Sequence, residues 1–212
     1  MKKIRVGING FGRIGRAVFR INHIKKYFEV VVINDINPDL NNLGYLLKYD
    51  TTYGRFIDEI KIKNQDFIID NKTISYLQHK RISDVPWDHY DVDLVIDSSG
   101  IKSNLDEMLN SSSDVKNFIV TNAPQDYPDI KTIIFGVNEN EIDANANRVF
   151  SSSICDTIAL APIIKTLEKI NKIESGFLTT LHPWLSYQNL LDGPSVSWSQ
   201  PGDINSHYAL GR

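Results

Sequence analysis

Cysteine is almost absent from this sequence, whose 212 residues contain only Cys155. A single cysteine cannot close a disulfide within the chain, so nothing in the composition indicates an oxidising compartment. No apolar run is long enough for a membrane span, and the opening MKKIRVGING has no apolar core of the kind a signal peptide needs. We therefore expect a cytoplasmic protein that does not enter membranes.

The sequence also lacks an excess of positive charge. The chain has 23 Lys and Arg against 26 Asp and Glu, and its net charge is −3. No basic run suits a phosphate backbone, so nucleic acid is not an expected partner. One alternative is a basic surface on the first predicted helix, but a solvated helix face explains these residues better: Arg13, Arg16, Arg20, Lys25 and Lys26.

Metal-ligand patterns are missing as well. The five histidines do not pair at ligand spacing. Asp88, His89, Asp91 and Asp93 gather ahead of a predicted strand, where a solvated loop is the better interpretation. We expect no metal.

What the sequence does contain is an alternation of strands and helices, which is typical of a parallel α/β sheet. Strands are predicted at 4–8, 30–33, 93–97, 118–120 and 133–135, and antiparallel strands with Asp-Asn turns between 59 and 80. The first helix is expected to bury Ile14, Val18, Ile21 and Ile24. The second is expected to start at Asn37-Pro38 and to bury Leu40, Leu43 and Leu47. A third carries Leu105, Met108 and Leu109.

A glycine motif lies between the first strand and the first helix. GFGRIG places Gly10, Gly12 and Gly15 at G-x-G-x-x-G spacing, and Asp35 ends the next strand. Such glycines permit a sharp turn, close approach of a pyrophosphate, and tight helix–strand packing. The carboxylate can accept hydrogen bonds from ribose hydroxyls and repel a 2′-phosphate, which favours NAD over NADP. A glycine-rich turn without a ligand explains less, because it leaves the acidic residue unaccounted for.

Several segments together resemble one family, the phosphorylating glyceraldehyde-3-phosphate dehydrogenases. They are GINGFGRIGR, YLLKYDTTYGRF, FGVN, the block around Cys155, LTTLHPW and LLDGPS. The resemblance implies a Rossmann-type doubly wound parallel sheet at 1–150 and the beginning of an α+β catalytic domain at 151–212. It also implies a homotetramer, a thiol nucleophile at Cys155 and a general base at His182. The NAD contacts that it implies are Asn9, Gly10, Gly12, Arg13, Ile14, Asp35, Ser99, Gly100 and Asn122.

The residues around Cys155 support a nucleophile. Serines precede it, and helical spacing runs from Leu160 to Ile170, with Pro162 either starting that helix or kinking it. A helix N-terminus favours the thiolate, and a predicted strand at 177–181 would deliver His182. The alternative is an inert, buried cysteine. As a nucleophile, the thiolate would add to an aldehyde, and loss of a hydride to NAD would leave a thioester for phosphate or water to release.

The chain departs from the family where phosphate should bind. Ile154 and Asp156 stand where a serine and a threonine are expected, Ile158 and Ala159 replace Asn and Cys, and Leu185 replaces a threonine. Thr157 remains a donor, so Thr157 and Asp156 are the expected substrate contacts. Weakened phosphate binding leaves three questions open: which sugar aldehyde is the substrate, whether water is the acceptor, and whether catalysis is lost. In the last case the protein would bind NAD as an interaction or regulatory protein. The family's second domain also continues further, so a fragment is the simplest account of the length.

Overall fold

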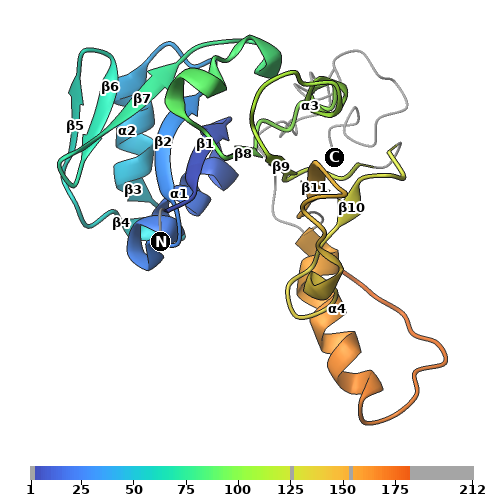
Figure 1. Ribbon diagram of the computed structural model, residues 1–212. Coiled ribbons are helices and arrows are strands. Elements are labelled where there is room, and N and C mark those ends of the chain that lie inside the picture. The colour runs from blue at the N-terminus through green and yellow to red at the C-terminus, as the bar shows by residue number, and fades with distance from the viewer. Residues whose placement is uncertain (1–2, 125–126, 153–154, 182–212) are drawn as a thin grey trace, which may run out of the picture.

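The computed structural model describes residues 3–124, 127–152 and 155–181. Within these residues, nine strands form one sheet in the order β10-β11-β9-β8-β1-β2-β7-β6-β5 (Figure 1). The parallel strands are β1 (Arg5–Asn9), β2 (Glu29–Asn34), β7 (Lys72–Leu77), β8 (Leu94–Asp97), β9 (Asn117–Val120), β10 (Lys131–Thr132) and β11 (Val149–Ser151). Antiparallel β5 (Ile60–Lys63) and β6 (Asp66–Ile69) extend one edge. The expected doubly wound α/β sheet is confirmed.

Helices α1 (Arg13–Lys25), α2 (Leu40–Lys48) and α3 (Asn104–Leu109) connect the strands and cover both faces of the sheet. Helix α4 (Cys155–Glu168) follows β11, and short 3-10 turns lie at Ile82–Asp84, Trp87–Tyr90 and Glu139–Glu141. A small hairpin pairs β3 (Tyr49–Asp50) with β4 (Gly54–Arg55). Neighbouring residues of one strand enter different cores: Ile96 packs in the cluster with Phe19 and Leu43, and Val95 in the cluster with Leu105. Side chains that alternate in this way are those of a sheet buried on both faces.

Helix α1 forms where the pattern predicts it, and Val18 packs against the core as expected, but the rest of its buried face is different. Ile14, Ile21 and Ile24 are 52%, 51% and 75% exposed, while Phe19 and Asn22 are buried. Asn22 faces inward because its side chain both donates to and accepts from the backbone of Phe28. Hydrophobicity alone therefore misassigned this face.

Two of the arginines expected on a solvated helix face are structural instead. Arg20 is 7% exposed and donates to the backbone oxygen of Leu47, at the end of α2. Arg16 donates to the backbone oxygen of Phe11 over 2.9 Å. Both guanidinium groups therefore tie α1 to neighbouring backbone, which makes a basic recognition surface on this helix less plausible still.

Other predicted boundaries shift. The N-cap of α2 is Asp39, whose carboxylate accepts from the Asn42 amide at 3.1 Å, so the helix starts after the predicted Asn37-Pro38. The strand predicted at 133–135 is wrong, because β10 ends at Thr132 and Phe135 is 87% exposed. The antiparallel β5–β6–β7 meander is confirmed, with the predicted Asp-Asn turn at Asp70 and Asn71 but an Asn-Gln turn at Asn64 and Gln65, all four with positive φ.

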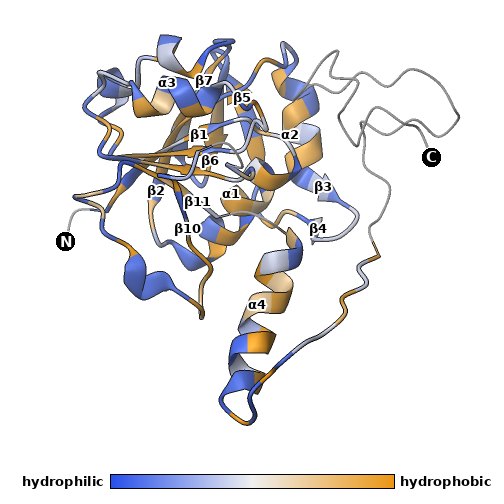
Figure 2. Cartoon of the chain, turned by 90° about the vertical axis from the view of Figure 1, so that its right-hand side faces the viewer, coloured by the Kyte–Doolittle hydropathy of each residue, from blue (hydrophilic) through white to orange (hydrophobic). Residues whose placement is uncertain are grey.

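Helix α4 stands apart from the sheet (Figure 1) and has no buried residue. It begins at Cys155, so Pro162 lies inside the helix instead of starting it. Apolar residues lie along it (Figure 2), and Ile163 and Leu167 are 57% and 49% exposed. The strand predicted at 177–181 is absent: these residues have no regular structure, and Phe177 is fully exposed. A strand needs a neighbour to bond with, and no described strand lies beside this segment.

Candidate functional site

The site is built where the chain changes direction across the sheet. From β1 the chain crosses through α1 to β2 on one side, and β8 lies on the other side of β1. Ligands of open α/β sheets bind at the carboxyl ends of the strands at such a point. A pocket of about 150 Å³ opens here, and its lining comprises Asn9, Gly10, Gly12, Asn34, Asp35, Ile36, His79, Lys80, Ser98, Ser99 and Ile101.

The glycine loop shapes this pocket. Gly10 has φ +85, and a β-carbon there would lie 2.5 Å from the backbone nitrogen of Ser99. A β-carbon on Gly15 would lie 2.2 Å from the backbone oxygen of Gly10, so helix and loop pack in close contact. A β-carbon on Gly12 would meet nothing within 4 Å. The open side of the loop is therefore at Gly12, where a ligand can approach the backbone.

The start of α1 borders the same opening. Gly12 is its N-cap and makes no side-chain capping bond, so first-turn amides of α1 have no partner inside the helix. Arg13 and Ile14 begin the helix, and both side chains are exposed. Free amides and the positive end of the helix dipole favour a phosphate group.

Asp35 lies directly after β2, and its side chain contacts the glycine loop. Its Oδ2 accepts from the Phe11 amide at 2.6 Å, and its Oδ1 accepts from the Asn37 amide at 2.8 Å. The carboxylate is half-buried and lines the pocket. Its position at the end of the second strand is the one from which an acid hydrogen-bonds a ribose in dinucleotide sites.

A buried polar network, which sequence reasoning missed, holds the ends of the central strands together. Asn34 donates to Asn9 Oδ1 at 2.7 Å, and Asn9 donates to Asp97 Oδ1 at 2.9 Å. Asp97 also accepts from the Ser99 amide and from Asn104, both at 3.1 Å. The sequence signal for it was polar residues that end three strands of a buried sheet.

Asp97 is the charged centre of that network and is 3% exposed. Burial raises the pKa of its carboxyl above the usual range, and hydrogen bonds from Ser99, Asn9 and Asn104 oppose that rise. Each removed donor therefore leaves a buried acceptor with one fewer partner, which makes the network sensitive to substitution.

The network also fixes the loop of Ser99 and Gly100, two of the expected NAD contacts. Ser99 Oγ accepts from the Ile101 amide at 3.2 Å and from Asn104 at 3.1 Å, and Gly100 has φ +74. Asn122 follows β9, also at the carboxyl ends of the parallel strands. Its side-chain oxygen is buried and accepts no hydrogen bond within the described part of the chain. A buried oxygen without a donor is compatible with a bound partner.

Cys155 follows β11, beyond the carboxyl ends of these strands, at the first position of α4. The thiol is exposed in the described part of the chain, and it donates to Asp156 Oδ1 at 3.7 Å. Asp156 is half-buried and Thr157 is exposed. His182 lies outside the described residues, so its distance to Cys155 stays a prediction.

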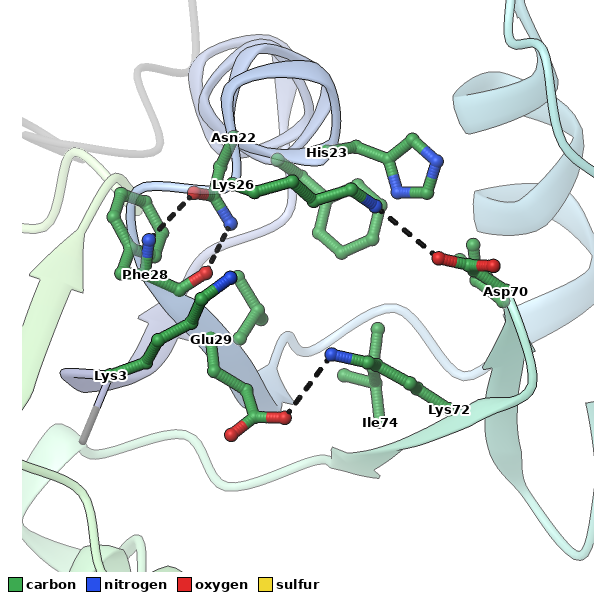
Figure 3. A pocket seen from close by; sticks show the side chains of 12 residues that line it. Lys3, Asn22, His23, Lys26, Phe28, Glu29, Asp70, Lys72 and Ile74 are labelled. Carbon is green, nitrogen blue, oxygen red and sulfur yellow. Dashed lines mark hydrogen bonds and ion pairs between the residues drawn. The ribbon is translucent and has the colours of Figure 1, made fainter. Parts of the chain in front are cut away.

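A second cavity lies at the opposite, amino ends of β1 and β2 (Figure 3). It measures about 50 Å³ and contains His23 with three lysines. Ion pairs occupy these lysines in part: Lys26 bonds Asp70 at 3.3 Å and Lys72 bonds Glu29 at 3.4 Å. The cavity is small and remote from the glycine loop.

Within residues 3–124, 127–152 and 155–181, no group of three or more His, Cys, Asp or Glu could hold a metal ion. No helix in this part of the chain has the length and apolar character to cross a membrane.

Residues 4–105 match the family model of the NAD binding domain of glyceraldehyde 3-phosphate dehydrogenase. The glyceraldehyde-3-phosphate dehydrogenase of Oncorhynchus mykiss is 35% identical over 92% of this chain and 58% of its own length. Glyceraldehyde-3-phosphate dehydrogenase 2 of Bacillus subtilis is 35% identical over 91% and 56%, and the Mycoplasma pneumoniae enzyme is 37% identical over 91% and 57%. The chain thus spans less than two thirds of these relatives. The pocket at the carboxyl ends of β1 and β2, the glycine loop and these matches together show that the chain belongs to the glyceraldehyde-3-phosphate dehydrogenase family, with NAD as the cofactor of its nucleotide site.

Proposed function

We propose that the full-length protein oxidises glyceraldehyde 3-phosphate or a related sugar aldehyde, with Cys155 as nucleophile and His182 as base. The observation that carries this proposal is the exposed thiol at the first position of α4, beyond the sheet edge that holds the coenzyme pocket. Residues 1–150 are then the NAD-binding domain and 151–212 the first part of the catalytic domain. The protein would be cytoplasmic and homo-oligomeric.

The residues of the pocket would divide the binding of NAD between them. Gly10 and Gly12 with the first turn of α1 would hold the pyrophosphate, and Asp35 a ribose. Ser99 and Gly100, fixed by the Asp97 network, would border the nicotinamide together with Asn122. Arg13 and Ile14, exposed at the start of α1, would cover the outer side. When bound, NAD supplies the acceptor for a hydride.

In the reaction, the Cys155 thiolate would form a bond to the aldehyde carbon as the carbonyl π bond opens, and the oxygen would take a proton from protonated His182 to give a thiohemiacetal. His182 would then take that hydroxyl proton back while the carbon loses a hydride, so that the aldehyde would be oxidised to a thioester. Phosphate or water then attacks the thioester carbon and releases the thiolate. Amides at the helix start near Cys155 can stabilise the developing oxyanion. Thr157 would donate to the substrate or the acceptor.

The acyl acceptor can be determined directly. NADH production is followed with the full-length protein and glyceraldehyde 3-phosphate, with and without inorganic phosphate. Phosphate-dependent turnover that yields an acyl phosphate identifies phosphate as acceptor, and equal turnover without phosphate identifies water. Absence of NADH formation with the substrate and with a panel of sugar aldehydes contradicts the proposal.

One observation favours a second candidate, a family member that binds NAD without turnover. Asp156 places a carboxylate 3.7 Å from the sulfur. That carboxylate holds the thiol in a hydrogen bond, and its charge repels a phosphate group. A protein with tight NAD binding but slow Cys155 alkylation, even at alkaline pH, fits this candidate and contradicts the first.

A further inference from the structure

Tyr76, on β7, places its hydroxyl beneath the loop that carries Asp35. The residue is paired in register with Ile33 of β2 and is 7% exposed. Its hydroxyl donates to the backbone oxygen of Asn37 and lies 3.1 Å from that of Asp35. One side chain from the neighbouring strand thus joins two carbonyls of the turn that follows β2.

This contact fixes the backbone of Asp35 and Asn37, and with it the position of the Asp35 carboxylate. The carboxylate itself bridges two amides, that of Phe11 at 2.6 Å and that of Asn37 at 2.8 Å. Asn37 therefore takes part twice: its amide donates to Asp35 and its carbonyl accepts from Tyr76. Displacement of Asn37 would shift the carboxylate relative to the glycine loop.

The remainder of the Tyr76 side chain is held independently of its hydroxyl. The ring packs edge-on against Phe67 with centroids 6.1 Å apart, and the backbone amide donates to Asp66 Oδ1 at 3.0 Å. Burial, together with the nearby charge of Asp35, raises the pKa of Tyr76, so the hydroxyl stays protonated and remains a donor. Removing the hydroxyl alone should leave the ring in place.

We infer that Tyr76 is a positioning residue for the ribose-binding carboxylate Asp35, and so a determinant of affinity for the adenosine half of NAD. This inference rests on the proposed function. It differs from a general contribution to folding, because it predicts an effect that depends on a particular ribose hydroxyl of the ligand.

The test is binding by the full-length protein with Tyr76→Phe, and with Tyr27→Phe as a matched control. Tyr27 is 70% exposed between α1 and β2. The ligands are NAD and an NAD analogue that lacks the adenosine 2′-hydroxyl. Loss of one hydrogen bond predicts about three- to tenfold weaker NAD binding by Tyr76→Phe and no change in the control. For the deoxy analogue we expect the penalty of Tyr76→Phe to fall below about twofold, because the group that Asp35 would bind is missing.

The outcomes separate this inference from the proposed function. Unchanged NAD affinity in Tyr76→Phe, or an equal loss for both ligands, overturns the positioning role while the wild-type protein still binds NAD. Failure of the wild-type protein to bind NAD overturns both. Should Tyr76→Phe not fold, fluorotyrosine labelling of the wild-type chain replaces it. A Tyr76 fluorine resonance that shifts with ADP-ribose but not with nicotinamide mononucleotide supports the role, and an unshifted resonance overturns it.

Discussion

The side-chain amide of Asn9 donates to Asp97 Oδ1 at 2.9 Å and joins the carboxyl ends of β1 and β8 inside the protein. Both residues are buried, at 5% and 3% exposed. The glycine loop begins immediately after Asn9 and the Ser99–Gly100 loop shortly after Asp97. Because the two loops border one pocket, this bond sets their separation.

Replacing Asn9 with aspartate tests the bond. The Asn9→Asp side chain has the same shape but brings a second carboxylate against Asp97, whose pKa burial already raises. Two carboxyl groups buried side by side bind one more proton in the folded variant than in the unfolded chain. The free energy of unfolding of the variant therefore falls as pH rises. We expect the variant to be close to wild type near pH 4 and at least about 2 kcal/mol less stable at pH 8. Urea unfolding across this range measures it.

The control for that experiment is Asn41→Asp, at an exposed position in the first turn of α2. It adds the same charge at the surface and should change stability by less than about 0.5 kcal/mol at every pH. An Asn9→Asp deficit that does not vary with pH contradicts the proposed sharing of a proton.

Gly10 and Gly12 should respond oppositely to a methyl group. Gly10→Ala places a β-carbon 2.5 Å from backbone at a φ of +85, so it should destabilise the fold by more than about 2 kcal/mol. Gly12→Ala meets nothing within 4 Å at a φ of −70, so the protein should fold normally. NAD binding should nevertheless fall at least about tenfold, because the methyl group fills the side open to the pyrophosphate. Thermal unfolding and calorimetric titration separate the two effects. Tight NAD binding by Gly12→Ala would contradict the prediction that the pyrophosphate lies against the backbone of Gly12.

Asp35→Asn should weaken discrimination between coenzymes. The amide oxygen can still accept from Phe11, as Asp35 Oδ2 does at 2.6 Å, but the charge that repels a 2′-phosphate is lost. We expect NADH binding to weaken about fivefold and the NADH/NADPH affinity ratio to fall about tenfold or more. Fluorescence titration with both coenzymes measures this. Asp39→Asn, at the N-cap of α2, is the control, and equal ratios in the two variants would contradict the role of Asp35.

Asp156→Asn should make Cys155 more reactive. The carboxylate accepts the hydrogen bond of the thiol at 3.7 Å, so its removal should free the sulfur for attack on an electrophile. Alkylation of the single cysteine by iodoacetamide at pH 7 should accelerate about two- to fivefold. Asp143→Asn, at an exposed acidic position ahead of β11, should leave the rate unchanged. Slower labelling of Asp156→Asn would show that the carboxylate assists the thiol.

Much of the nucleotide site could be predicted from the sequence because its physical requirements are local. A turn that needs positive φ requires Gly10, and Asp35 directly follows β2, which pairs with the strand before it, β1. The Asn9–Asp97 bond could not be predicted, since its residues are 88 positions apart. Only the strand order, which brings β8 beside β1, makes them neighbours.

The errors on helices and strands also have physical causes. Ile14, Ile21 and Ile24 follow a helical period, yet Asn22 lies inward because it bonds the backbone of Phe28. The segment 177–181 has strand-forming residues but no described strand beside it to bond with. Local propensity cannot show either of these tertiary effects.

The central claim is that Cys155 carries the substrate as a thioester during oxidation. Intact-protein and peptide mass spectrometry of the full-length protein, quenched in acid after mixing with NAD and glyceraldehyde 3-phosphate without phosphate, measures it directly. We predict an acyl adduct on the peptide that contains Cys155, absent from Cys155→Ser and accumulating more slowly in His182→Ala. An unmodified Cys155 peptide from a wild-type protein that has bound NAD, with this substrate and with other sugar aldehydes, would contradict the account.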